Sequence, residues 1–406
     1  MKLPIYLDNN ATTPIDPRVL EAMMPYLTDI FGNAASRTHA FGHAAARAVD
    51  VARQQVADLL HADPKEIIWT SGATESDNLA VKGAAFAGRS RGDHIITQVT
   101  EHKAVLDTCK WLERQGFRVT YLPVDRTGRI DAGRLEAEIT ARTILVTIML
   151  ANNEIGTMQP IDEIGRLCAA KGVLFHCDAT QAVGKVPIDV GKQNIHLLSL
   201  SGHKLYGPKG VGALYVRMKD PRVKLEPIIH GGGHERGFRS GTLNVPGIVG
   251  LGKACEISGA EMATESPRLA AMRDAFWANL SSRLDGISRN GHDVHCLPNT
   301  INISFAYVEG ESIMLNMPEI AVSSGSACTS ATLEPSYVLT ACGVPDEVAH
   351  GSLRFSLGRF NTPDQLEYTA DRLVETIGRL REMSPLYEMA KEGVDLSKVQ
   401  WKSDSG

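Results

Sequence analysis

The sequence predicts an α/β protein with a mostly parallel central sheet and a smaller α+β domain. From about residue 17 to residue 260, short apolar runs alternate with amphipathic stretches of helical period, which is the pattern of repeated βαβ units. After residue 261 this alternation stops, and a long charged stretch is followed by isolated strand patterns. We therefore expect a large domain of residues 16–261 and a small domain made of residues 1–15 and 262–406.

The small domain is expected to contain helices and strands in addition to the N-terminal arm. The spacing predicts a charged helix over residues 266–284 and a closing helix that begins at Pro363. Strand patterns lie between them, near residues 299–305 and 352–357. Together with the N-terminal arm, these elements would form one α+β unit.

The composition is that of an ordinary globular protein of 406 residues. Hydrophobic residues make up 43% and charged residues 22%, and the chain is long enough to bury two cores. The net charge of −5 argues against a nucleic-acid or membrane-surface partner. The seven cysteines are unclustered, which argues against a disulfide framework, and neither a signal-peptide pattern nor a membrane-spanning run is visible. The cytoplasm is the expected location.

Two polar side chains at neighbouring strand ends suggest a pyridoxal phosphate site. Asp178 follows the apolar strand of residues 173–177, and Lys204 comes shortly after the apolar run 195–198, between glycines. An acid can keep the pyridine nitrogen of this cofactor protonated, and a lysine amine can bind its aldehyde. Taken singly, a helix cap at Asp178 and a solvated turn lysine are the simpler explanations. Taken together, an acid and a lysine at two strand ends favour a pyridoxal phosphate site over these simpler explanations.

A phosphate cradle is predicted at residues 70–74, where an apolar strand meets a helix that begins near Glu75. Free backbone N–H groups and the helix dipole favour an anion at such a junction. An ordinary capping box, with Thr74 as the N-cap and Asp77 at the third helical position, explains the same residues. Glu75 and Asp77 would repel a phosphate unless their side chains point away. Two donors near Lys204 could complete the cradle: Ser201 and His203.

Two further polar groups also follow strands. His102 comes after the strand of residues 94–97, where an imidazole can stack on an aromatic cofactor or transfer protons. Asn153 comes after the apolar run 143–150, where its amide can bond a cofactor oxygen or a carboxylate, although an Asx-turn is the commoner use. Because ligands bind at the carboxyl ends of parallel strands, we expect these groups to meet in one site.

The segment of residues 323–330 (SSGSACTS) places Cys328 among small and hydroxylated residues. Cysteine usually packs in a core, but no apolar face surrounds it here. A mobile, exposed thiol suits a nucleophile that enters a pocket and then leaves it. A surface linker that happens to contain a cysteine is the plain alternative.

Seven motifs, in their order and spacing, resemble those of class I cysteine desulfurases of the IscS/NifS family, which are fold-type I enzymes that use pyridoxal 5′-phosphate. The motifs are residues 70–76 (TSGATES), 100–102 (TEH), 178–181 (DATQ), 201–204 (SGHK), 239–242 (RSGT), 323–330 (SSGSACTS) and 354–359 (RFSLGR). The resemblance runs from Tyr6 to Trp401 and is closest to the housekeeping IscS branch. Residues 36–39 and 385–401 resemble that branch, whereas residues 8–11 resemble the nitrogen-fixation branch, so the pathway stays open.

The resemblance implies a role in the cofactor site for each matching residue. Lys204 would carry the aldehyde, Asp178 would hold the pyridine nitrogen, and His102 would stack on the ring and transfer protons. Gln181 and Asn153 would bond the ring oxygen. The implied cofactor site is completed around the phosphate by Ala73, Thr74, Ser201, His203 and, in a homodimer, Thr242 of the partner subunit.

The implied reaction takes sulfur from L-cysteine and gives L-alanine. Asn153 and Arg354 would hold the substrate carboxylate, although Arg354 is also explained as an ordinary strand-edge charge. Cys328 would attack the substrate sulfur and keep it as a persulfide. The sulfur would pass to acceptor proteins, for iron-sulfur cluster assembly on a scaffold protein and for other transfers such as tRNA thiolation. Cys328 would also be a transient ligand of a [2Fe-2S] cluster shared with that scaffold, and no resident metal is expected.

Two other functions fit many of the same residues. A selenocysteine lyase would share every cofactor residue, whereas a catalytically idle scaffold for assembly proteins would not need both Lys204 and Cys328.

Residues 292–296 (HDVHC) include metal-ligating side chains, but one short span makes a poor metal site. The basic stretch of residues 217–224 is either a solvated surface or, by the resemblance, a docking site for acidic partner proteins.

Overall fold

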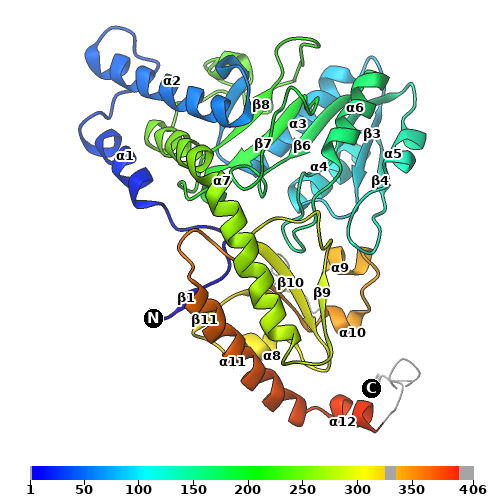
Figure 1. The fold of residues 1–406 in the computed structure, drawn as a ribbon. Helices are drawn as coiled ribbons and strands as arrows, with labels where there is room; N and C mark the ends of the chain where they lie inside the picture. The colour runs from blue at the N-terminus through cyan, green and yellow to red at the C-terminus, as the bar shows by residue number, and fades with distance from the viewer. Residues whose placement is uncertain (1, 325–334, 393–406) are drawn as a thin grey trace, which may run out of the picture.

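A seven-stranded sheet forms the centre of the computed structural model, which describes residues 2–324 and 335–392 (Figure 1). The strands lie in the order β2-β8-β7-β6-β5-β3-β4. Strand β8 is antiparallel to both of its neighbours, and the other neighbouring pairs are parallel. The mostly parallel sheet predicted from the sequence is therefore confirmed. Its strands are β2 (Ile67–Thr70), β3 (His94–Gln98), β4 (Arg118–Leu122), β5 (Thr143–Thr147), β6 (Leu174–Asp178), β7 (Leu197–Ser201) and β8 (Gly212–Val216).

Helices cover both faces of this sheet, because side chains of both faces are apolar. In β2, Ile67 and Trp69 join the apolar cluster that contains residues of α2, α6 and α7, whereas Ile68 joins the cluster on the α3 and α4 side. Helix α4 shows the matching pattern, since its buried residues recur at helical spacing: Val105, Thr108, Cys109 and Leu112. The helices of this region are α1 (Pro17–Thr28), α2 (Ala40–Leu60), α3 (Ala73–Gly88), α4 (Lys103–Arg114), α5 (Ala132–Glu138), α6 (Ile161–Lys171) and α7 (Val245–Ser281).

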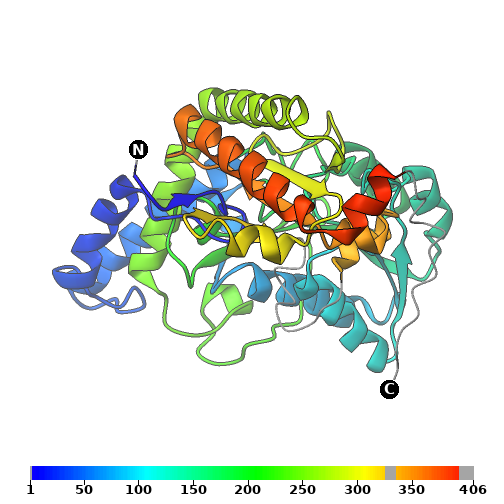
Figure 2. The ribbon, with the colours of Figure 1, turned by 90° about the horizontal axis from the view of Figure 1, so that it is seen from below.

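A second sheet, antiparallel throughout, lies in the order β12-β13-β10-β9. Phe305 and Phe355 belong to its apolar core, and helix α11 packs along α7 (Figure 2). The N-terminal arm joins this half of the molecule through the parallel pair β1-β11. The elements are β1 (Ile5–Tyr6), β9 (Ile287–Asn290), β10 (Thr300–Phe305), β11 (Ile320–Ala321), β12 (Ser323–Ser324), β13 (Ser352–Ser356), α8 (Gly310–Leu315), α9 (Tyr337–Ala341), α10 (Asp346–Ala349), α11 (Pro363–Glu382) and α12 (Pro385–Lys391).

Helix α7 corrects the helix predicted over residues 266–284. It begins at Val245, ends at Ser281 and contains Pro267 in its interior. Its first half is rich in glycine and alanine and is buried on more than one side, so no amphipathic pattern marks it in the sequence. The helix runs from the large sheet to the small one (Figure 1). Because it crosses residue 261, the domain division at that residue stays a prediction.

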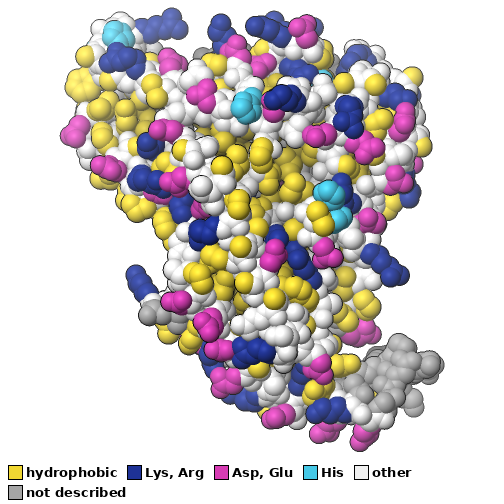
Figure 3. Space-filling view, viewed as in Figure 1, with side chains coloured by type: hydrophobic (Ala, Val, Ile, Leu, Met, Phe, Trp, Pro, Cys, Tyr) yellow, Lys and Arg dark blue, Asp and Glu magenta, His cyan; other side chains and the backbone are white. Residues whose placement is uncertain are grey.

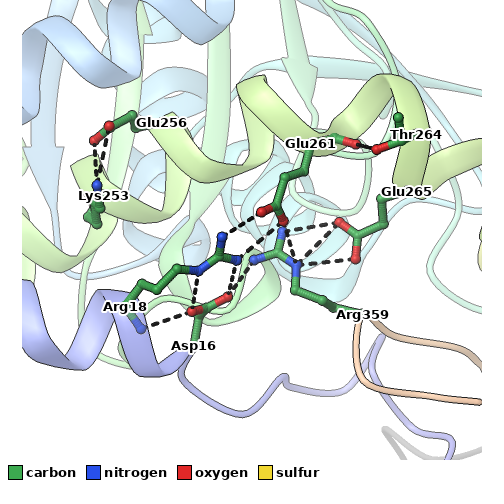
Figure 4. A network of polar contacts seen from close by, with 8 residues as sticks. All are labelled: Asp16, Arg18, Lys253, Glu256, Glu261, Thr264, Glu265 and Arg359. Carbon is green, nitrogen blue, oxygen red and sulfur yellow. Dashed lines mark hydrogen bonds and ion pairs between the residues drawn. The ribbon is translucent and has the colours of Figure 1, made fainter.

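A network of ion pairs ties the N-terminal arm to α7 and to the segment after β13 (Figure 4). Asp16 Oδ2 lies 2.7 Å from Arg359 Nη1 and 2.8 Å from Arg18 Nη2. Arg359 also pairs with Glu265 at 3.1 Å, and Arg18 pairs with Glu261. The hydrogen bond from Arg18, and after it the one from Arg359, holds the pKa of Asp16 far below its usual range. The arm is thereby fixed beside the two sheets.

Among the helices that the structure describes, none has the length and apolar character needed to cross a membrane.

Candidate active site

A cavity of about 730 Å³ lies at the carboxyl ends of the central strands. Its walls come from the segments that follow β2, β3, β5, β6 and β7, and from β13 of the second sheet. The structure places these predicted site residues in its wall: Ala73, Thr74, His102, Asn153, Asp178, Gln181, Ser201, His203, Lys204 and Arg354. Thr242 is exposed and lies outside this cavity, and Cys328 lies outside the described residues.

Lys204 ends a single 3-10 turn that follows β7. Its Nζ donates to the backbone carbonyl oxygens of Asn10 and, at 2.7 Å, of Ala11. The N-terminal arm therefore holds the amine at the cavity wall. Strand β7 ends at Ser201 rather than at Leu198, as the apolar run indicated, because its pairing with β8 continues to Ser201.

Asp178 is the last residue of β6 and is 6% exposed. Its Oδ1 accepts a hydrogen bond of 2.9 Å from the backbone N–H of Thr180 and caps the turn that follows β6, where no helix forms, so the helix cap suggested by the sequence is wrong. That bond uses one lone pair of a carboxylate that also lines the cavity. Capping and ligand binding are therefore compatible at this residue.

His102 is the N-cap of α4. Its Nδ1 accepts a hydrogen bond of 3.1 Å from the backbone N–H of Ala104, which assigns the proton of a neutral ring to Nε2. Burial lowers the pKa of His102 and favours this neutral form. A neutral imidazole in the cavity wall can stack on a flat ring and exchange a proton at Nε2.

Helix α3 begins at Ala73, two residues before Glu75, and its N-cap is Gly72, so the predicted cap at Thr74 is wrong. Gly72 has a φ of 154°, a backbone conformation that glycine adopts easily, and it lets the chain turn early from β2 into the helix. Within the described part of the chain, no side chain caps this first turn. Its N–H groups therefore form an anion-attracting end beside the cavity.

Glu75 and Asp77 both border the cavity, but the Asp77 side chain is fully buried and its Oδ1 lies 3.6 Å from His176 Nε2. Although burial raises the pKa of Glu75, hydrogen bonds from Arg239 and Ser71, each 2.8 Å, lower it overall. Asp77 is fully buried, and this burial, followed by nearby Asp178, raises its pKa well above the usual range. The Arg239 guanidinium offsets the charge of Glu75, and the raised pKa of Asp77 favours its neutral form, which lessens the repulsion expected from the sequence.

Arg354 reaches the cavity from the second sheet. Its Nη1 donates to the carbonyl oxygen of Asn153 at 3.0 Å, and its Nη2 lies 2.7 Å from Asp8 Oδ1. In the described residues, several buried polar atoms of the cavity lining have no hydrogen-bond partner, among them Arg354 Nε and Asn153 Oδ1. Because buried polar groups are nearly always paired, these atoms are positions that a polar ligand would satisfy.

Asp8 and Asn10 line the cavity although the sequence assigned them no role. The carbonyl oxygen of Asn10 accepts from Lys204 and, at 3.0 Å, from Gln181 Nε2. The Nδ2 of Asn10 donates to the carbonyl oxygen of Asn153 at 3.2 Å. The available hint was the run of polar residues 8–10, which follows Tyr6 and Leu7. The contacts of Asn10 join it to residues far away in the chain, so no local sequence pattern reports them.

Two other features noted in the sequence lie away from this cavity. Arg217, Arg222 and Lys224 line a second cavity of about 570 Å³. The sulfur of Cys296 accepts hydrogen bonds from two arginines, at 3.1 and 3.3 Å: Arg273 and Arg289. In the ranges that the structure covers, no three histidine, cysteine or acidic side chains are grouped to hold a metal ion.

Comparisons place the chain among known proteins. Residues 5–369 match the family model described as aminotransferase class-V. The chain is 60% identical over 401 residues to a cysteine desulfurase IscS of Anaeromyxobacter sp. (strain Fw109-5), and 58% identical over 403 residues to one of Escherichia coli (strain K12 / DH10B), with 99% of both chains covered each time. A solved NifS-like protein has a TM-score of 0.86 at 39% identity, covering 92% of this chain and 99% of the other. SspA in complex with cysteine has a TM-score of 0.78 at 41% identity, covering 88% and 100%.

Proposed function

We infer that this chain, which belongs to the class-V aminotransferase family, is a cysteine desulfurase that uses pyridoxal 5′-phosphate to take sulfur from L-cysteine and release L-alanine. One structural observation carries the assignment of the site. Asp178 and Lys204 lie in one cavity, at the ends of the neighbouring strands β6 and β7. These are the acid and the amine that the cofactor requires.

The cavity wall fits this cofactor. The open N-terminus of α3 and the side chains of Thr74, Ser201 and His203 suit its phosphate. The unpaired Oδ1 of Asn153 marks a polar position that a bound ligand would satisfy. We assign the pyridine nitrogen to Asp178, and the phosphate site also to Ala73 and, in a homodimer, to Thr242 of the partner subunit. When bound, the cofactor supplies an electron sink that lets the α-proton and the β-sulfur of cysteine leave.

Three side chains would then handle protons and orientation. Asp178 would keep a proton on the pyridine nitrogen, and Lys204 would bind the aldehyde until the substrate amine replaces it. His102, neutral and protonated at Nε2, is placed to stack on the ring and exchange a proton. Gln181 would bond the ring oxygen through its amide.

The substrate carboxylate is assigned to Arg354 and Asn153. The guanidinium keeps one buried N–H, at Nε, without a hydrogen-bond partner in the described residues, and it lies in the cavity wall. A planar arginine is suited to a carboxylate, because its donors form a fork of fixed geometry.

Cys328 is the proposed nucleophile, although it lies outside the described residues. Residues before and after the undescribed stretch that contains Cys328 lie at or near the cavity. Ser323 lines the cavity, and the Oγ of Ser336 donates to Glu154, the neighbour of Asn153 in the sequence, at 2.5 Å. A thiolate at Cys328 would attack the substrate sulfur and hold it as a persulfide.

We propose that acceptor proteins take the sulfur, among them an iron-sulfur scaffold protein and proteins of tRNA thiolation. Cys328 would share a transient [2Fe-2S] cluster with that scaffold. The second cavity offers an acidic acceptor three basic side chains: Arg217, Arg222 and Lys224.

A cytoplasmic location is proposed because the described cysteines are all free thiols.

We also propose a homodimer, for two reasons. Large apolar side chains are exposed along one face of α1, on the chain that leads into α2 and in the first turn of α2: Leu20, Met24, Leu27, Phe31 and Phe41. Apolar side chains are visible on this part of the surface, among charged ones (Figure 3). Such a group of exposed apolar side chains suits an interface. In addition, Thr242 is exposed and lies outside the cavity of its own chain, as a residue donated to a neighbouring subunit would.

A Cys328→Ser variant tests the proposed chemistry, with Cys296→Ser as the matched control. After a short pulse of L-cysteine, mass spectrometry should find one extra sulfur on the Cys328 peptide of the wild type and of the control. Cys328→Ser should still change the cofactor absorption with L-cysteine, because Lys204 and Asp178 are intact. It should release almost no alanine, because a serine oxygen cannot hold a persulfide. Alanine release by Cys328→Ser, or extra sulfur on another cysteine, would contradict the assignment.

A further inference from the structure

The guanidinium of Arg354 already holds a carboxylate of the protein itself. Arg354 Nη2 lies 2.7 Å from Asp8 Oδ1, and the two side chains are only 5% and 17% exposed. Both residues line the cavity that we assign to the substrate. The fork that would receive the carboxylate of an amino acid is therefore partly occupied by Asp8.

The backbone on either side of Asp8 is anchored, and the ion pair with Arg354 holds its carboxylate. The N–H of Leu7 bonds to the carbonyl oxygen of Ala321 at 2.9 Å, and Leu7 accepts from the N–H of Ser356 at 2.7 Å. The N–H of Asn9 bonds back to Ser356 at 3.2 Å. The carboxylate of Asp8 is thus a fixed part of the cavity wall, and an incoming ligand meets it in place.

Two of the three guanidinium nitrogens of Arg354 bond to the protein, and the third is open. Nη1 is bonded to the carbonyl oxygen of Asn153, Nη2 to Asp8, and Nε has no hydrogen-bond partner among the described residues. A second carboxylate that binds here shares one positive charge with Asp8. Because this region is sheltered from water, repulsion between the two carboxylates is only partly screened.

We propose that Asp8 tunes affinity at the substrate site, because it weakens the binding of the α-carboxylate of amino-acid ligands at Arg354. The inference rests on the proposed role of Arg354 in binding this group. L-Cysteine and L-alanine carry the same carboxylate, so Asp8 weakens the binding of substrate and product alike. Weaker binding of L-alanine favours release of the product, whereas weaker binding of L-cysteine raises KM. When the ligand leaves, Asp8 retains Arg354 in its binding position.

Asp8→Asn is the direct test, because it keeps the size of the side chain and an oxygen that accepts from Nη2 while it removes the charge. Asp50→Asn, at an exposed position on α2, is the control for the same change in net charge. Binding to the holoenzyme is measured by calorimetry with two ligands, L-alanine and L-alaninamide, an analogue that lacks the carboxylate. Melting temperature and cofactor content confirm that each variant is intact.

We expect Asp8→Asn to bind L-alanine about tenfold more tightly or better, and Asp50→Asn to match the wild type. Binding of L-alaninamide should not tighten, because it carries no carboxylate for Asp8 to repel. In turnover, KM for L-cysteine should fall in the variant and inhibition by L-alanine should become stronger. Asp8→Ser removes the same charge with a smaller side chain and gives the same reading if the asparagine variant does not fold.

Unchanged or weaker binding of L-alanine by an intact Asp8 variant would overturn the proposal and leave Asp8 with a purely supporting role. Equal tightening for both ligands would overturn it too, because the effect would then not concern the carboxylate. Arg354→Gln separates this outcome from a failure of the proposed function. If that variant bound L-alanine as well as the wild type, the carboxylate site itself would be misassigned.

Discussion

Burial beside the active site favours the neutral form of several carboxyl groups. Burial raises the pKa of Asp77 and Glu101 well above the usual range, and it raises the pKa of Glu154 to about 7. The sequence indicated Asp178 and Lys204 because each stands near a strand end. It could not indicate burial, which depends on neighbours hundreds of residues away, as the pairing of Asp8 with Arg354 also does.

Glu154 provides a test of how a pKa raised by burial changes the stability of the protein with pH. The unfolded chain loses the Glu154 proton near pH 4.5, whereas the folded protein holds it to about pH 7, so wild-type stability falls as the pH rises through this range. Glu154→Gln removes this loss. Relative to the wild type, the variant should gain up to roughly 3 kcal/mol in free energy of unfolding between pH 4.5 and pH 8, at about 1.4 kcal/mol per pH unit.

Urea denaturation at several pH values measures this difference. Glu367→Gln, at an exposed position on α11, is the control and should keep the wild-type dependence on pH. A Glu154→Gln variant whose stability follows the wild type at every pH would show that Glu154 is ionised normally in the folded protein.

At the scale of elements, strands were predicted well and helix ends poorly. Buried parallel strands carry short apolar stretches, so β3, β5 and β6 are visible in the sequence although each also contains polar residues. The start of α3 depends on the unusual backbone of Gly72, and the first half of α7 has no amphipathic pattern. Neither feature follows from the local order of polar and apolar residues.

Gly72→Ala tests the turn that opens α3 toward the proposed phosphate. An added Cβ would find space, since its nearest contact is Ser201 Oγ at 3.8 Å, so the cost lies in the backbone conformation. We expect a loss of roughly 1–3 kcal/mol in stability and weaker retention of the cofactor, measured by thermal melting and cofactor content. Gly378→Ala, inside α11 and free of contacts, should instead stabilise slightly. Equal behaviour of the two variants would refute the role of Gly72.

At the scale of the whole molecule, the site depends on the meeting of two sheets. Asp178 and Lys204 come from the large sheet, Arg354 comes from the small one, and Asn10 of the N-terminal arm contacts residues of both. Ligands bind at the carboxyl ends of parallel strands, and this rule predicted that Asp178 and Lys204 lie in the site. Arg354 was predicted only by resemblance to a family, because no local pattern reports which residue of a second sheet reaches the cavity.

The most direct test of the account is to find which lysine binds the cofactor. Borohydride reduction of the holoenzyme makes the linkage between lysine and cofactor permanent, and peptide mapping then locates it. We predict the modification on Lys204 and its loss in Lys204→Ala, which should stay folded but produce no alanine. Lys209 lines the same cavity and Lys185 lies behind Lys204, so both are available competitors. Modification of either one in the wild type, or of no lysine at all, would contradict the proposed site.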